Sequence, residues 1–211
     1  MTTPSAATRR WQRGLCDSPL LGVWATWTLT HLVGIVLITV LGVLLAAVIS
    51  RGSAIVIVTG CLVWWYAGAL LLSTGQWLAL RRTALAPSQW IWWSLLGWTG
   101  AGAVGGVIAL LTVVHGWPAD VAWAGGAAVA GALVGLSQWL ALRRRVARAT
   151  LWMTVTPVAF AAGTAAAVGL GTHLGDLGVV LALPVGGMVT GAITGWALLT
   201  LLQPSLASPR A

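Results

Sequence analysis

The sequence contains no lysine, no glutamate and no asparagine, and aspartate occurs only three times in 211 residues. Charged residues make up 7% of the chain, hydrophobic residues make up 59%, and the mean hydropathy is +0.94. A soluble domain of this length needs a more polar surface, so the composition predicts that lipid surrounds most of the protein. The lack of glutamate also leaves very few carboxylates for acid–base chemistry or metal binding.

Cysteine is also scarce, since Cys16 and Cys61 are the only two. Cys16 precedes the first apolar run and Cys61 lies inside the second, so we expect the two thiols at different depths in a membrane. This argues against a disulfide framework and against a metal site built on two cysteines.

All 11 basic residues are arginine, and the net charge is +8. In a soluble protein such a balance would suggest a nucleic-acid partner. Here the arginines occupy short segments between apolar runs, which is typical of membrane topology signals, and we expect no nucleic-acid binding. Six apolar segments are each long enough to cross a hydrocarbon core of ~30 Å as a helix; they span residues 22–49, 54–80, 89–115, 121–142, 151–174 and 179–202.

The distribution of arginine predicts the orientation of these spans. With the N-terminus in the cytoplasm, ten arginines fall on the cytoplasmic side, and the other side carries Arg51 with Asp120 and Asp176. Membrane proteins concentrate basic residues in their cytoplasmic loops. We therefore expect a multi-pass protein of a bacterial-type inner membrane with both termini cytoplasmic, its arginines lying against anionic lipid headgroups.

The heptad QWLALRR occurs twice, at residues 76–82 and again at 138–144, and closes the second and fourth spans. Small residues precede each heptad at a spacing of four, and a third such pair lies in the last span; we assign these six positions to helix packing: Ala69, Ser73, Gly131, Gly135, Gly191 and Gly195. The odd-numbered spans share a Trp-led pattern in which His31, Ser94 and Thr156 are equivalent.

These correspondences predict an all-α polytopic membrane fold of six helices, arranged as three hairpin repeats inserted in the same sense. A cytoplasmic segment (1–21) precedes a six-helix membrane domain (22–202), and a cytoplasmic tail (203–211) follows. The hairpin repeats span about 22–80, 89–142 and 151–202.

The repeated GxxxGxxQWLxLRR pattern resembles repeats in a loose group of uncharacterised multi-pass bacterial membrane proteins. The resemblance covers most of residues 54–202 and rests on packing and interface motifs. It implies the membrane topology and no activity. Leu198 departs from the pattern, because it stands where the first two repeats have Gln76 and Gln138.

His31 is the candidate of greatest interest, because we expect it about ten residues into the first span, near the middle of the bilayer. An ionisable residue there faces the bundle interior and is a functional candidate by default. With Ser94 and Thr156 it would form a polar belt on the bundle axis, which serves either helix–helix hydrogen bonding or a ligand or solute pathway. Gln76 and Gln138, one turn inside the cytoplasmic edge, are open to the same two interpretations.

The 15 tryptophans suggest two roles. Most fit interfacial belts, among them Trp77, Trp90, Trp139 and Trp152 on the cytoplasmic side. Trp64, Trp65 and Trp98 fall near mid-membrane, where they either pack against glycines or line a site for a flat apolar ligand such as a quinone, carotenoid or lipid tail.

Two imidazoles and two carboxylates on the outer side, His115, Asp120, His173 and Asp176, are ligand types that zinc accepts, but their spacing is not diagnostic and we assign no metal site. We find no catalytic constellation and expect no enzyme, and the sequence does not identify a cofactor. The sequence thus favours a non-enzymatic module that packs against helices or holds an apolar ligand, with a homo-oligomer or a membrane-protein partner. The alternative is a small-solute transporter or channel around His31, with kinks at Pro157 and Pro184.

Overall fold

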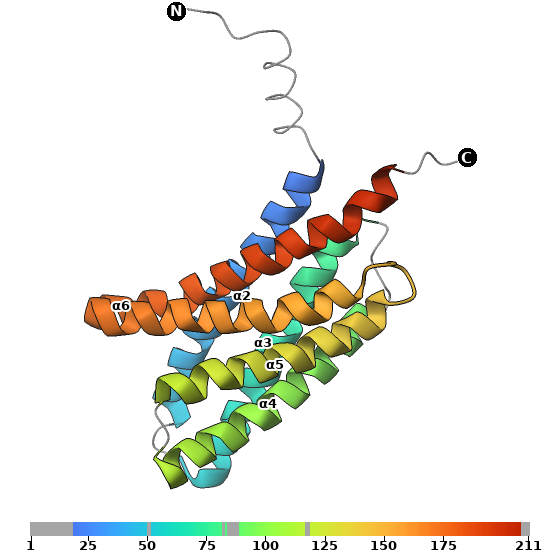
Figure 1. Ribbon diagram of the computed structural model, residues 1–211. Coiled ribbons are helices and arrows are strands. Elements are labelled where there is room, and N and C mark those ends of the chain that lie inside the picture. The colour runs from blue at the N-terminus through green and yellow to red at the C-terminus, as the bar shows by residue number, and fades with distance from the viewer. Residues whose placement is uncertain (1–18, 50–51, 82, 84–88, 117–118, 208–211) are drawn as a thin grey trace, which may run out of the picture.

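The computed structural model describes residues 19–49, 52–81, 83, 89–116 and 119–207. Within these residues the fold is all-helical and has no strand. Cys16 and the N-terminal arginines lie outside them, whereas Cys61 is a free, exposed thiol. Five helical elements follow one another (Figure 1): α2 Pro19–Ile49, α3 Ala54–Leu80, α4 Trp90–His115, α5 Ala119–Leu142 and α6 Thr150–Ala207.

The element α6 is itself a helical hairpin. Its backbone leaves the helical region at Gly175, with φ 56° and ψ −137°, a conformation that glycine adopts without a Cβ penalty. A methyl group at Gly178 would overlap the Leu170 carbonyl, so the turn also needs a glycine there. The described residues therefore contain six helices long and apolar enough to cross a membrane, as the sequence predicts. The last helix runs to Ala207, five residues past the expected end of the span.

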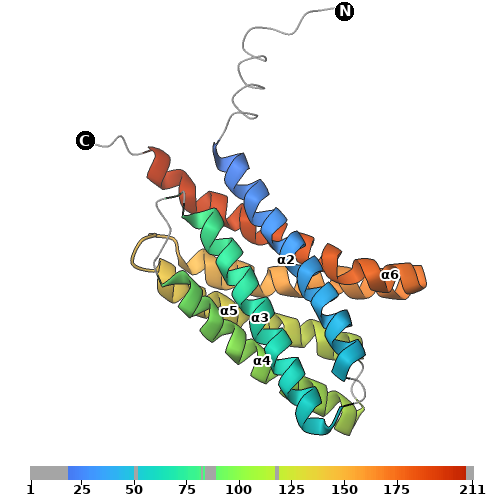
Figure 2. The same ribbon diagram turned by 180° about the vertical axis from the view of Figure 1, so that it is seen from behind.

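The helices form a closed ring. Each contacts its neighbour in the chain, and the second half of α6 returns to contact α2. The described ends of the chain, Pro19 and Ala207, lie at the same end of the bundle (Figures 1 and 2). This arrangement is what an even number of antiparallel spans requires.

Buried side chains gather at the end of the bundle that carries Arg81, Arg143–Arg145 and Arg148, here called the arginine end. The cluster contains three sets of positions that the proposed repeat makes equivalent: Trp27, Trp90 and Trp152; Ala79, Ala141 and Leu201; Leu80, Leu142 and Leu202. Such sets are what a triplicated hairpin would bury. They support the repeat, which stays a prediction.

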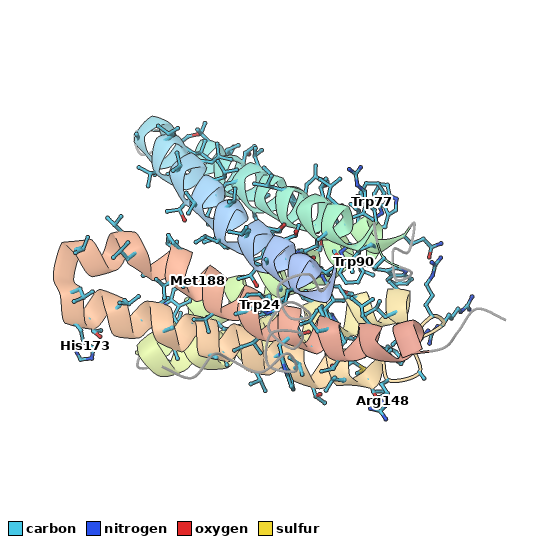
Figure 3. The ribbon with its side chains drawn as sticks, turned by 90° about the horizontal axis from the view of Figure 1, so that it is seen from above. Trp24, Trp77, Trp90, Arg148, His173 and Met188 are labelled. Carbon is cyan, nitrogen blue, oxygen red and sulfur yellow. The ribbon has the colours of Figure 1, made fainter. Side chains whose placement is uncertain are left out.

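The three hairpins diverge toward the opposite end. Figures 1 and 3 together show the α2–α3, α4–α5 and α6 hairpins converging where Trp77 and Arg148 lie, and separating toward the end where His173 lies. Glycines follow the same division. Most of those near the arginine end, such as Gly97, Gly135 and Gly195, face a neighbouring helix closely, and Gly22 is an exception. Five glycines farther from this end face nothing within 4 Å: Gly105, Gly106, Gly125, Gly169 and Gly171. The hairpins are therefore held together mainly at one end.

Candidate functional site

Three tryptophans form a ring inside the arginine end, here called the tryptophan ring: Trp27, Trp90 and Trp152. Their centroids lie 6.1, 5.7 and 6.2 Å apart, and each pair meets edge to face. Such pairs stabilise by roughly 0.5–1.5 kcal/mol beyond the area they bury. Trp90 and Trp152 are at most 1% exposed, so their assignment to an interfacial belt was wrong. Each sits at the start of its helix but faces the bundle axis instead of the headgroups.

A chain of hydrogen bonds, here called the polar chain, lies next to the ring. The Trp152 indole N–H donates to Gln138 Oε1 at 2.9 Å. Gln138 Nε2 donates to Gln76 Oε1 at 3.1 Å, and Gln76 Nε2 lies 3.1 Å from His31 Nε2. His31 Nδ1 lies 2.9 Å from the Trp27 carbonyl oxygen. The chain thus joins side chains from all three hairpins.

Two branches bring in the remaining helices. Gln138 Nε2 also donates to Ser94 Oγ at 3.0 Å, which attaches α4. The Trp27 indole N–H donates to Thr194 Oγ1 at 3.0 Å, which attaches the second half of α6. All six helices are therefore linked through buried polar side chains at one level of the bundle.

The direction of every bond in the polar chain follows from its two ends. An indole N–H only donates, so it fixes the Gln138 oxygen toward Trp152 and the amide nitrogen toward Gln76. The same reasoning turns the Gln76 nitrogen toward His31. At the other end the Trp27 carbonyl only accepts, so His31 carries a proton on Nδ1. Since His31 Nε2 accepts from the Gln76 amide, it carries no proton, and the imidazole is neutral. Both imidazole nitrogens are then occupied by hydrogen bonds.

The side chain of His31 is bonded to a residue near the arginine end. Its partner Gln76 stands five residues before Arg81, which is about 7–8 Å along a helix. His31 is 6% exposed and Gln76 is 4% exposed, so neither side chain reaches the headgroups or solvent. Helix–helix hydrogen bonding is therefore what the structure shows for both residues, and for Gln138 with them.

Thr156 lies at the same level of the bundle as the polar chain but is not part of it. Its hydroxyl donates to the Trp152 carbonyl of its own helix at 2.7 Å. It faces Gly135, where an added methyl would lie 2.9 Å from Thr156 Cβ. Of the three residues of the expected belt, His31 and Ser94 are connected through Gln76 and Gln138, and Thr156 is buried beside them.

The predicted packing positions lie at helix contacts. A methyl at Gly131 would lie 2.9 Å from Pro157 Cα, one at Gly191 would lie 2.8 Å from His31 Cβ, and one at Gly195 would lie 2.9 Å from Trp24 Cδ1. Ala69 and Ser73 in α3 are likewise buried. These contacts join consecutive hairpins, as small residues in membrane helices often do.

The mid-membrane tryptophans pack mainly against backbone. Trp64 donates its N–H to the Ile38 carbonyl at 2.8 Å, and Trp65 donates to the Trp98 carbonyl at 3.0 Å. Their indoles lie over glycines, because a methyl at Gly42 or Gly102 would come within 2.8 Å of the indole nitrogen. The packing interpretation accounts for these two residues.

Trp98 differs, because its ring contacts Trp65 and Phe160 while its N–H has no partner among the described residues. The other buried side-chain atoms of this kind are Thr28 Oγ1, Ser73 Oγ and Trp90 Nε1. Three of these four atoms belong to α3 and α4.

The outer candidates are not assembled into a metal centre within the described residues, where no group of three potential ligands occurs. His115 ends α4, whereas His173 lies near the turn of α6 and points away from the bundle (Figure 3), and both are exposed. The side chains of Asp120 and Asp176 lie outside the described residues. The backbone stays helical through Pro157 and Pro184, and within α6 only Gly175 has non-helical angles.

Comparison of this chain with protein families, with curated proteins and with solved structures finds no match in any of the three.

The tryptophan ring is the feature that sequence reasoning missed. The signal was present, since Trp27, Trp90 and Trp152 each stand four residues before His31, Ser94 and Thr156. Residues four apart share a helix face, so an inward-facing polar residue places the preceding tryptophan inward as well.

Proposed function

We propose that this integral membrane protein is a non-enzymatic module that binds a transmembrane helix of a partner. The polar chain and the tryptophan ring fix its hairpins at the arginine end. The diverging ends of the hairpins then receive an apolar helix, either from a second copy or from another membrane protein.

The main support for this proposal is that some glycines contact a neighbouring helix whereas others face open space. Gly131 and Gly191 are each closely approached by a neighbouring helix of the same protein. On the diverging halves, Gly105 and Gly106 in α4, Gly125 in α5, and Gly169 and Gly171 in α6 face open space. Because lipid removes the hydrophobic drive for association, membrane helices associate by close backbone approach at small residues. The open glycines offer such an approach to a helix from outside the chain.

The polar chain argues against the transporter alternative. A solute pathway through the level of His31 would have to separate His31, Gln76 and Gln138, which are bonded to each other and buried. The polar chain also contains no charged side chain that would compensate the charge of a moving ion. Bonding within the bundle accounts for these polar residues without transport.

The orientation is part of the proposal. Arg81, Arg143, Arg144 and Arg148 are exposed at one end of the bundle, which suits anionic headgroups at the cytoplasmic face of a bacterial inner membrane. Arg143 also lies over the Trp139 ring at 5.3 Å, an arrangement suited to the headgroup level.

The test is native mass spectrometry of the protein released from nanodiscs, with Gly105→Leu and Gly171→Leu as variants and Gly22→Leu as the matched control. Gly22 also faces open space, but it lies at the start of α2. The proposal predicts a complex with a second copy or a defined protein, lost in both variants and kept in the control. A monomer in all four samples contradicts it, as does a stoichiometric apolar small molecule in place of a protein.

A further inference from the structure

Ser73 and Trp90 present an energetic problem on adjacent helices. Both are fully buried, at 0% exposure, and Ser73 Oγ and Trp90 Nε1 have no hydrogen-bond partner in the part of the protein that the structure describes. A buried polar group left unpaired destabilises the fold, because it has lost its hydrogen bonds to water. The pair lies on α3 and α4, which share a less extensive interface than the α2–α3, α4–α5, α5–α6 and α2–α6 pairs.

The equivalent positions elsewhere in the bundle indicate where Ser73 points. Ser73 corresponds to Gly135 and Gly195 in the other two hairpins. Gly135 faces Thr156, the counterpart of Ser94, and Gly195 faces Trp27, the counterpart of Trp90. The correspondence therefore directs the Ser73 hydroxyl toward Ser94 and Trp90, at a place where the other hairpins have no side chain.

The other two tryptophans of the ring have acceptors, whereas Trp90 has none among the described residues. Trp27 donates to Thr194, and Trp152 donates to Gln138. The corresponding acceptor for Trp90 would be Gln76, but its Oε1 already accepts from Gln138. Ser94 Oγ also accepts from Gln138, so its own proton is available to donate.

We propose that one water molecule binds between α3 and α4, where it accepts from the Trp90 N–H and exchanges hydrogen bonds with the hydroxyls of Ser73 and Ser94. Water suits this set because the indole only donates, whereas a serine hydroxyl both donates and accepts. Buried waters typically make about three such bonds. At the level of the tryptophan ring, the bound water would link α3 and α4 as the Trp152–Gln138 and Trp27–Thr194 hydrogen bonds link the other hairpins directly. This link would form independently of any partner.

A double-mutant cycle with Ser73→Ala and Trp90→Phe tests this site, with the thermal midpoint of unfolding as the readout. Ser137→Ala paired with Trp90→Phe is the matched control, since Ser137 is a buried serine whose hydroxyl donates to its own backbone at Val134. A bridging water predicts that Ser73→Ala lowers the midpoint by several degrees. It also predicts that the midpoint of the double variant falls by clearly less than the sum of the decreases in the single variants. In the control pair the two decreases should add.

If the Ser73 hydroxyl has no partner, Ser73→Ala should raise the thermal midpoint, because alanine removes a buried polar group and is the better helix former. A raised or unchanged midpoint for Ser73→Ala, or additive effects with Trp90→Phe, overturns the proposal. If Trp90→Phe does not fold, a high-resolution experimental structure decides. Density within hydrogen-bonding distance of Ser73 and Trp90 supports the site, and direct packing of α3 on α4 without such density overturns it.

Discussion

The side-chain amides of Gln76 and Gln138 are hydrogen-bonded to each other, Nε2 of Gln138 to Oε1 of Gln76 at 3.1 Å. The two residues open the identical heptads of the first and second hairpins. The heptads are therefore more than interfacial anchors, because their first residues tie two hairpins together inside the bundle. The third hairpin has Leu198 at this position and joins the network through Trp152 and Thr194 instead.

Replacing Gln138 with leucine, the residue of the third hairpin, should destabilise the fold. The change leaves the Trp152 N–H without its acceptor and the Gln76 oxygen without its donor. We expect the free energy of unfolding to fall by about 1–3 kcal/mol, measured by denaturant titration in mixed micelles. Gln89→Leu is the matched control, since Gln89 is exposed, and its effect should stay within about 0.5 kcal/mol. Equal effects of the two substitutions would argue against a bracing role for the polar chain.

Two glycines of α5 should respond to alanine with opposite signs. Gly131→Ala would push a methyl to 2.9 Å from Pro157 Cα, a backbone atom that cannot move aside, and should cost about 1–3 kcal/mol. Gly125→Ala meets nothing within 4 Å, so its higher helix propensity should stabilise by up to about 1 kcal/mol. The same unfolding assay measures both. Stabilisation by Gly131→Ala would show that α5 and α6 are not in close contact.

Labelling from each side of the membrane tests the orientation. In a protein without Cys16 and Cys61, a membrane-impermeant maleimide should reach Arg148→Cys only from the cytoplasm and His173→Cys only from the opposite side. Both residues are exposed and lie at opposite ends of the bundle (Figure 3). The reverse labelling pattern would invert the assigned topology.

The sequence predicted the six helices because hydrophobic length and short polar connections determine membrane spans almost independently of packing. It also identified His31, Gln76, Gln138 and Ser94, since polar side chains in apolar helices are rare enough to stand out. It did not reveal that they form one chain, because which helices meet around the axis depends on tertiary packing.

The prediction that Trp90 and Trp152 lie in an interfacial belt was wrong for a related reason. Tryptophan at a helix end suits a headgroup layer equally well, and only the neighbouring helices show which face is inside. The level of His31 within the bundle could not be derived from its own helix, because its partner Gln76 lies 45 positions away in the sequence.

The protonation of His31 tests the central claim most directly. In the polar chain, Trp152 and the Trp27 carbonyl together require a neutral imidazole with its proton on Nδ1. Nitrogen-15 NMR of histidine-labelled protein in lipid bilayers, with His31→Leu to assign the signal, should show His31 as this single tautomer. A proton on Nε2, or averaging of both tautomers in the unmodified protein, would contradict the directional chain and its role in fixing the hairpins.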